Sequence, residues 1–282
     1  MKLLRYGPPG LERPGLLDAA GAIRDLSGLL TDIGPDTLSP DTLQALAALD
    51  PRRLPVVDGA PRLGTPWRGI GKFVAVGLNY GRHAAEAGMA IPAEPTLFCK
   101  WTSCISGPDD DIVIPPGCAR VDWEVELGIV IGSRARAVDE ADALRHVAGY
   151  CLANDVSERE YQIDRGGGQW GKGKGFDSFG PLGPYLVTAD EVPDPQDLEL
   201  WLELNGERRQ TGHTGDMIFS CARLVSECSR VMTLEPGDVI ITGTPAGVGM
   251  GARPPRYLEA GDVVTLGGGV LGSQTQRVVA AG

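Results

Sequence analysis

The sequence has no long hydrophobic run and few aromatic residues, and these two shortages exclude several classes of protein. No stretch of about 18 apolar residues occurs, so we expect no transmembrane helix. The chain reaches Gly7-Pro8-Pro9 before an apolar signal segment could form, so we expect no export signal. Only 6% of residues are aromatic, whereas glycine numbers 40 and proline 22, which favours short strands and tight turns over a helical bundle.

Cysteine and positive charge are also scarce. The six cysteines form no Cys-x-x-Cys pair, and several lie within apolar runs, where a free thiol behaves as a small hydrophobic group. We therefore expect a reducing, cytoplasmic location. Lysine and arginine number 26 against 37 acidic residues, and the net charge of −11 argues against nucleic acid or an anionic membrane as a partner. An acidic total does not forbid a locally cationic pocket.

The 282 residues can form a small domain followed by a large one. Residues 1–67 predict a small α+β cap domain, and the segment 61–71, rich in proline and glycine, predicts a linker. Residues 68–282 then form the catalytic domain. Its apolar runs predict strands at 72–76, 96–100, 112–114, 121–131, 147–154, 185–188, 198–204, 239–242, 263–266 and 274–280, and helices at 81–87, 139–146, 157–165 and 220–232. The expected fold class is α+β, mostly β.

Two glutamates two residues apart carry the first chemical signal. The run 121–131 predicts one strand, and its period of two places Glu124 and Glu126 on the same face. Two like charges at that distance repel unless a cation or proton lies between them. Asp155 follows another apolar run and could supply a third oxygen ligand, which suits Mg²⁺, Mn²⁺ or Ca²⁺ rather than Zn²⁺. A Glu-x-Glu pair taken alone is more often the solvated face of an edge strand.

His83 and Glu86 share one face of the helix expected over 81–87. A carboxylate beside an imidazole raises its basicity and fixes its tautomer, as a general base requires, although an isolated pair of this kind is more often a weak surface ion pair. Gly166 to Lys172 fits G-x-x-x-x-G-K, but Gly173 stands where a phosphate-binding loop needs Ser or Thr. We therefore reject a nucleotide loop and expect residues 166–176 to be a mobile loop that delivers a lysine.

Seven segments resemble the fumarylacetoacetate hydrolase superfamily in order and spacing, over roughly residues 72–251. They are Asn79-Tyr80-x-x-His83-x-x-Glu86, Pro95-x-Leu97-Phe98-x-Lys100, Glu124-x-Glu126-Leu127, Asn154-Asp155, Lys174-Gly175-Phe176, Asn205-Gly206 and Thr242-Gly243-Thr244-Pro245-x-Gly247-Val248-Gly249. This resemblance implies a mixed β-roll with a divalent metal, Mg²⁺ or Mn²⁺, held by Glu124, Glu126 and Asp155.

The resemblance also implies roles for the other motif residues. His83 and Glu86 form a dyad on a lid helix that activates water, and Lys174 stabilises the developing oxyanion. Substrate contacts are implied for four residues, which are Tyr80, Arg159, Gln162 and Thr244. The family's substrates are acylpyruvates and related 2-keto acids, and its members commonly form homodimers.

Two segments, residues 172–184 and 201–206, look most like hydrolases of 2,4-diketo-3-deoxy sugar acids such as the L-rhamnonate or L-fuconate derivatives, which would give pyruvate and a 2-hydroxy acid. One departure is His213 to Asp216, where the resemblance predicts Thr or Ser and no acid; His213 is expected in a loop. Two alternatives stay open: an isomerase or decarboxylase of a 2-keto acid, of oxaloacetate or hydroxymuconate type, on the same metal site, and an inactive metal-binding module. Intact His83, Glu86 and Lys174 favour a hydrolase over the inactive module.

Overall fold

The computed structural model describes all 282 residues, and strands form most of its regular structure, which confirms the expected α+β, mostly β class. The largest sheet has 11 strands, in the order β3-β2-β1-β13-β11-β10-β16-β5-β6, with β4 paired to β1 and β7 to β13. Their bounds are β1 (Lys2–Tyr6), β2 (Arg13–Leu17), β3 (Ile23–Asp25), β4 (Leu63–Gly64), β5 (Phe73–Gly77), β6 (Thr96–Lys100), β7 (Ile105–Ser106), β10 (Val125–Ile131), β11 (Val147–Asn154), β13 (Gly180–Thr188) and β16 (Val239–Ile241).

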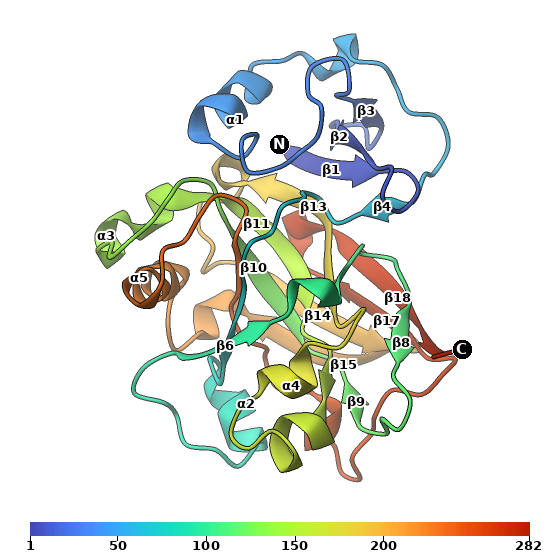
Figure 1. The fold of residues 1–282 in the computed structure, drawn as a ribbon, viewed down its shortest axis with the longest axis vertical. Coiled ribbons are helices and arrows are strands. Elements are labelled where there is room, and N and C mark those ends of the chain that lie inside the picture. Colours follow the sequence, from blue (N-terminus) through green and yellow to red (C-terminus); the bar gives the residue numbers. More distant parts are fainter.

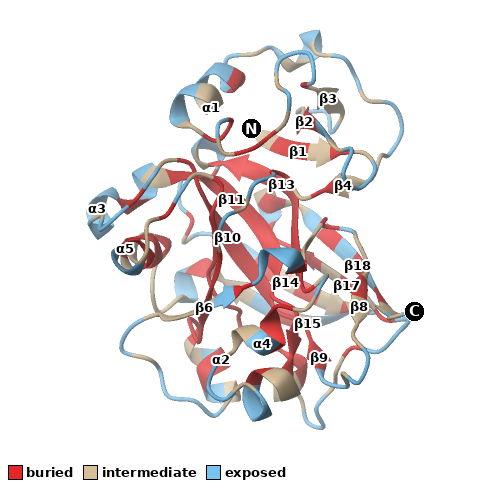
Figure 2. Cartoon of the chain, viewed as in Figure 1, coloured by how far each residue is buried: buried red, intermediate tan, exposed pale blue.

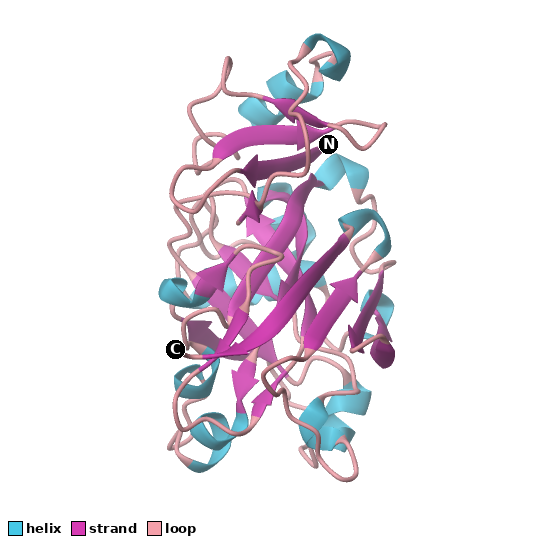
Figure 3. Ribbon diagram, turned by 90° about the vertical axis from the view of Figure 1, so that its right-hand side faces the viewer, coloured by secondary structure: helices cyan, strands magenta, loops and turns pink.

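A second sheet of five strands has the order β15-β14-β17-β18-β8, and β9 pairs with β12 in a separate short ladder. The bounds are β8 (Ile112–Ile114), β9 (Val121–Asp122), β12 (Ser157–Glu158), β14 (Glu199–Leu204), β15 (Glu207–His213), β17 (Val263–Gly267) and β18 (Ser273–Ala280). Most neighbours are antiparallel, but β5 runs parallel to β16 and β8 parallel to β18. The sheets are therefore mixed, as the predicted β-roll requires (Figure 3).

The helices are short and lie around the sheets. They are α1 (Pro40–Ala47), α2 (Gly81–Glu86), α3 (Glu140–Ala143), α4 (Gly171–Lys174), α5 (Cys221–Val231), a π-helix at Glu160–Asp164, and 3-10 turns at Pro51–Arg53, Thr102–Cys104, Leu144–His146, Ala189–Glu191, Thr214–Asp216, Gly249–Gly251 and Gly269–Leu271. Both α2 and α4 lie at the end of the molecule opposite the N-terminal segment (Figure 1). None of these helices has the length and apolar character needed to cross a membrane.

Strands β10 and β11 form the buried centre of the large sheet (Figure 2). Every residue of both strands is buried, which explains their nearly continuous apolar sequence, because a strand covered on both faces has no solvent side. The N-terminal residues extend this sheet through the pairing of β1 with β13. Trp67 also joins the N-terminal segment to the rest of the chain, because it is fully buried and its indole N–H donates to the Gly237 carbonyl at 2.9 Å. A separate domain ending at residue 67 stays a prediction.

The predicted strand over 121–131 is wrong in one respect that matters for the site. It is broken at Trp123 and Glu124, so β9 pairs with β12, whereas β10 pairs with β11 and β16. Side chains take over the hydrogen bonds at the break, because Asp122 accepts from the Trp123 N–H and Asn154 accepts from the Glu124 N–H. Three smaller differences follow: residues 157–165 divide into β12 and the π-helix, residues 171–174 form α4, and His213 ends β15.

Candidate active site

Three carboxylates meet where β10 begins and β11 ends. Glu124 precedes β10, Glu126 is its second residue, and Asp155 directly follows β11; because the two strands are antiparallel neighbours, these ends lie side by side. Carboxylate oxygens of the three residues lie within 4.8 Å of one another, and no side chain of the three is more than slightly exposed. The structure thus brings together the three residues that the sequence predicted as metal ligands.

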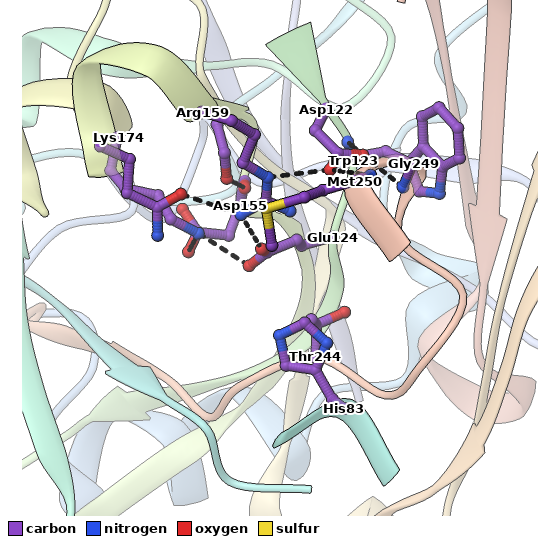
Figure 4. A network of polar contacts seen from close by, with 12 residues as sticks. His83, Asp122, Trp123, Glu124, Asp155, Arg159, Lys174, Thr244, Gly249 and Met250 are labelled. Atoms are coloured by element: carbon purple, nitrogen blue, oxygen red, sulfur yellow. Dashed lines mark hydrogen bonds and ion pairs between the residues drawn. The ribbon is translucent and has the colours of Figure 1, made fainter. Parts of the chain in front are cut away.

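Three buried cations surround this cluster, and Figure 4 shows two of them, Lys174 and Arg159. The Lys174 Nζ lies 2.7 Å from Glu124 Oε2 and 2.6 Å from Asp155 Oδ2. Arg159 Nη1 lies 2.7 Å from Glu124 Oε1, and Lys100 Nζ lies 2.6 Å from Asp155 Oδ1. Glu126 has no such partner, and its Oε2 accepts only the Gly243 N–H, at 2.7 Å. Buried charges need partners, so Glu126 is the member of the cluster that is least neutralised.

The pKa values follow this distribution of charge. Burial alone would raise the pKa of Glu124, but Lys174 and Arg159 bring it down to about 2. For Glu126, burial raises the pKa well above its usual range, and the charges of Asp155 and Glu124 raise it further. A dication would supply the missing positive charge, and each carboxylate oxygen keeps a second lone pair for it. The three-oxygen donor set therefore fits Mg²⁺ or Mn²⁺.

His83 faces the carboxylates from helix α2 across open space (Figure 4). Its Nδ1 lies 3.3 Å from Glu86 Oε2, and both oxygens of Glu86 accept the Gly247 N–H, at 3.1 and 3.2 Å. Gly251 must lack a side chain, because a Cβ there would lie 2.3 Å from Glu86 Cδ. Glu86 is thus fixed by the loop after β16, and with the proton on Nδ1 the other ring nitrogen, Nε2, is free to accept one.

A cavity of about 350 Å³ joins these groups. Seven of the ten predicted site residues line it, which are His83, Glu124, Glu126, Arg159, Gln162, Lys174 and Thr244. Asp155 and Glu86 do not line the cavity themselves. Asp155 contacts Lys174, and Glu86 contacts His83. Tyr80 does not line this cavity: it lines a neighbouring one, and its hydroxyl is buried without a hydrogen-bond partner. The Thr244 hydroxyl already donates to the Val125 carbonyl at 2.9 Å and accepts from Gln210 at 2.8 Å.

Four buried residues position the site, and we assigned them no role from the sequence. Asp122 accepts from Arg159 Nε at 2.8 Å, and Lys100 holds Asp155. The other two are amides: Asn79 bonds the Thr242 and Phe219 backbones, and Gln210 bonds those of Val125 and Pro245. Asp122, Asn79 and Lys100 stand next to or inside the motifs, and this proximity is the only signal that could have indicated them. Gln210 has none.

The sequence and the fold are similar to those of known proteins. A family model described as fumarylacetoacetate (FAA) hydrolase C-terminal matches residues 72–279. A Burkholderia multivorans protein named "Putative hydrolase" is 61% identical over the full length of both chains. Two solved structures, each matched over the full length of both chains, are similar: 5-carboxymethyl-2-hydroxymuconate delta-isomerase from Mycobacterium smegmatis (34% identical, TM-score 0.77) and maleylpyruvate hydrolase from Sphingobium sp. SYK-6 in complex with manganese(II) and pyruvate (29% identical, TM-score 0.83).

The family match covers the whole segment that contains the carboxylate cluster, the His83–Glu86 pair and Lys174. The relative and both solved structures extend that similarity over the remaining N-terminal residues. The chain is an enzyme that belongs to the fumarylacetoacetate hydrolase family.

Proposed function

We propose that the protein is a metal-dependent hydrolase that cleaves a carbon–carbon bond of a 2,4-diketo acid, releasing pyruvate and a carboxylic acid. One observation carries this proposal: a histidine held by a glutamate faces, across one cavity, a cluster of three carboxylates suited to a divalent ion. A bound Mg²⁺ or Mn²⁺ on Glu124, Glu126 and Asp155 would supply Lewis acidity toward the chelating 2-keto acid. We further propose a cytoplasmic homodimer, which the six free cysteines and the family resemblance support.

The substrate's carboxylate has a natural partner in Arg159. Two guanidinium nitrogens are occupied, Nε by Asp122 and Nη1 by Glu124 and Gln162, so the side chain is held from two directions. The third, Nη2, is buried and has no hydrogen-bond partner in the chain. A buried donor of this kind is costly unless a ligand uses it, and a carboxylate is the best acceptor for a guanidinium. Arg159 therefore fixes the pyruvyl end of the substrate.

His83 supplies the base for hydrolysis. Its Nε2 removes a proton from water while the oxygen attacks the distal carbonyl carbon, C4, and Glu86 stabilises the imidazolium that forms. The bond between C3 and C4 then breaks with its electron pair on C3, which gives the enolate of pyruvate and the acid from the distal side. Protonation of C3 completes the reaction. The Lys174 ammonium stabilises the negative charge that develops beside it.

Product analysis tests this proposal. The purified protein is supplied with Mg²⁺ or Mn²⁺ and given acetylpyruvate, 2,4-diketo-3-deoxy-L-rhamnonate or oxaloacetate, and pyruvate is measured together with its co-product. Pyruvate with acetate, or pyruvate with lactate from the sugar acid, supports hydrolysis. Pyruvate and CO₂ from oxaloacetate, without cleavage of any 2,4-diketo acid, contradicts it.

A second candidate function is isomerisation or decarboxylation of a 2-keto acid, and the similarity to a delta-isomerase supports it. Those reactions need the 2-keto acid to be polarised but need no attacking water. The two candidates therefore differ in their dependence on His83. An isomerase would turn over a 2-hydroxymuconate-type diene and leave every carbon–carbon bond intact.

A further inference from the structure

Resting on the proposed function, the lining of the active-site cavity restricts the tail of the substrate. Every charged residue that lines the cavity belongs to the carboxylate cluster, to the cations paired with it (Arg159 and Lys174) or to the His83 dyad. Apart from Gln162 and Thr244, the rest of the wall is apolar, and its main contributors are Val76, Leu78, Met89, Phe98, Ile163 and Trp170. We propose that the enzyme selects 2,4-diketo acids whose acyl tail is apolar and uncharged, in preference to tails that carry hydroxyl groups or a second carboxylate; this departs from the sugar-acid tail that the resemblance of residues 172–184 and 201–206 implies.

The apolar wall includes two aromatic rings that pack against each other. The rings of Phe98 and Trp170 meet edge to face, with centroids 5.4 Å apart and planes at 67°. Trp170 can lie there only because residue 77 is glycine, since a Cβ on Gly77 would lie 2.1 Å from the indole ring. These two rings come from β6 and from the residue before α4, and together they give the tail an apolar surface beside Lys174, whose Nζ lies 5.4 Å from the Phe98 ring centroid.

No cation in this cavity remains for a second carboxylate. Lys174 pairs with Glu124 and Asp155, and the free Nη2 of Arg159 serves the first carboxylate of the substrate. Gln162 accepts a hydrogen bond from Arg159, so its amide lies beside the guanidinium that binds the first carboxylate of the substrate. A charged or hydroxylated tail against the apolar wall would lose its water without gaining partners, which is unfavourable.

Three arginines do lie near, but they line a different cavity. Arg82, Arg208 and Arg209 surround a space of about 830 Å³ that shares no lining residue with the active-site cavity. Two of them are already paired within the chain, Arg208 with Glu203 and Arg209 with Glu207. Because none of the three, Arg82 included, lines the active-site cavity, they do not face a tail that lies on Phe98 and Trp170.

A series of acylpyruvates with the same pyruvyl end tests the proposal. We compare kcat/KM for acetylpyruvate, butanoylpyruvate, benzoylpyruvate, fumarylpyruvate and 2,4-diketo-3-deoxy-L-rhamnonate, with Mg²⁺ present. From acetyl to butanoyl, kcat/KM should rise by about fourfold for each methylene that becomes buried, and the two polar tails should fall below acetylpyruvate. A polar tail that equals or exceeds butanoylpyruvate overturns the proposal. Cleavage of none of the five instead overturns the proposed hydrolase function.

Two variants test where the tail lies. Met89 and Ile163 line the cavity yet are 46% and 52% exposed, so an arginine at either position can reach solvent and the fold should tolerate it. Met89→Arg and Ile163→Arg should each lower the preference for butanoylpyruvate over fumarylpyruvate by about tenfold or more. Leu29→Arg is the matched control, because Leu29 is 55% exposed but lies in the N-terminal segment. An unchanged preference in both cavity variants overturns the assignment of this wall to the tail.

Discussion

Two lysines two residues apart on α4 have opposite surroundings. Lys174 is buried between Glu124 and Asp155, whereas Lys172 lies at the surface and donates only to the Arg165 carbonyl. Burial lowers the pKa of Lys174, but the two carboxylates more than offset this and raise it above its usual value. The ammonium therefore stays charged, and it neutralises a cluster that would otherwise repel itself.

This difference predicts the effect of removing each charge. Lys174→Met should destabilise the metal-free protein by about 3–5 kcal/mol, because it leaves buried carboxylates without their partner. Lys172→Met should stay within about 0.5 kcal/mol of the parent protein, as is usual for surface changes. Urea unfolding of both variants in EDTA measures these values. Equal stability of the two variants would show that Lys174 does not neutralise the cluster.

His83 separates hydrolysis from the other reactions that the same site could perform. His83→Ala should lower kcat for a 2,4-diketo acid by about 10²- to 10⁴-fold, the usual range for loss of a general base. Binding of pyruvate should change little, because Arg159 and the carboxylate cluster are untouched. His146→Ala is the control, since His146 contacts Ser133 outside the cavity. Hydrolysis at the parent rate in His83→Ala would give precedence to the isomerase or decarboxylase function.

At the scale of the element, α2 and the residues after it have the features of a lid. The helix ends at Glu86, Gly88 has a positive φ of 67°, and residues 88–91 are exposed. Glu86 ties the helix to Gly247, whereas Met89 reaches the cavity. We predict that the segment from Tyr80 to about Pro92 opens and closes over the substrate, which excludes all water but the attacking molecule.

Limited proteolysis and hydrogen exchange measure this motion. Amides of residues 87–92 should exchange quickly in the free protein and more slowly with Mg²⁺ and pyruvate, while those of β10 stay protected in both states. Protease should cut the free protein in this segment first. Identical exchange of the segment with and without pyruvate would argue against a lid.

The sequence predicted most elements because their signals are local. Alternation and apolar runs located β10, β11 and β16. The break at Glu124 was not predictable, because side chains replace the ladder hydrogen bonds there. Asn154, 30 residues away, accepts the Glu124 N–H, and Asp122 accepts the Trp123 N–H. Likewise, Gln210 reaches Val125 from another sheet, and no pattern near Gln210 indicates that contact.

At the scale of the whole molecule, the three buried cations balance the carboxylate cluster, so the net charge of −11 lies elsewhere in the chain. The homodimer expected from the family stays a prediction, which sedimentation equilibrium at micromolar concentration would check. A mass near 29.7 kDa for the particle would contradict it, because that is the mass of one chain.

Metal binding should stabilise the entire fold, because its ligands meet only when β10 and β11 are paired. An ion that binds the folded chain alone adds about 2.7 kcal/mol to the free energy of unfolding when its concentration is 100 times its Kd. We therefore predict that Mg²⁺ or Mn²⁺ raises the urea midpoint, that EDTA reverses this rise, and that EDTA also abolishes activity. Undiminished turnover of metal-free protein would contradict the proposed function.

Glu126→Gln should change the stability of the protein in opposite directions without and with metal. In the parent protein, burial and the charges of Asp155 and Glu124 oppose ionisation of Glu126, so its charge destabilises the metal-free fold at neutral pH. Glutamine keeps the shape and removes that charge, so the metal-free variant should unfold at a higher urea concentration than the metal-free parent. The same substitution removes a charged ligand, so the rise in midpoint with Mg²⁺ should shrink or vanish. A variant that is less stable than the parent without metal, yet gains as much from Mg²⁺, would mean that Glu126 is structural and that the ion binds elsewhere.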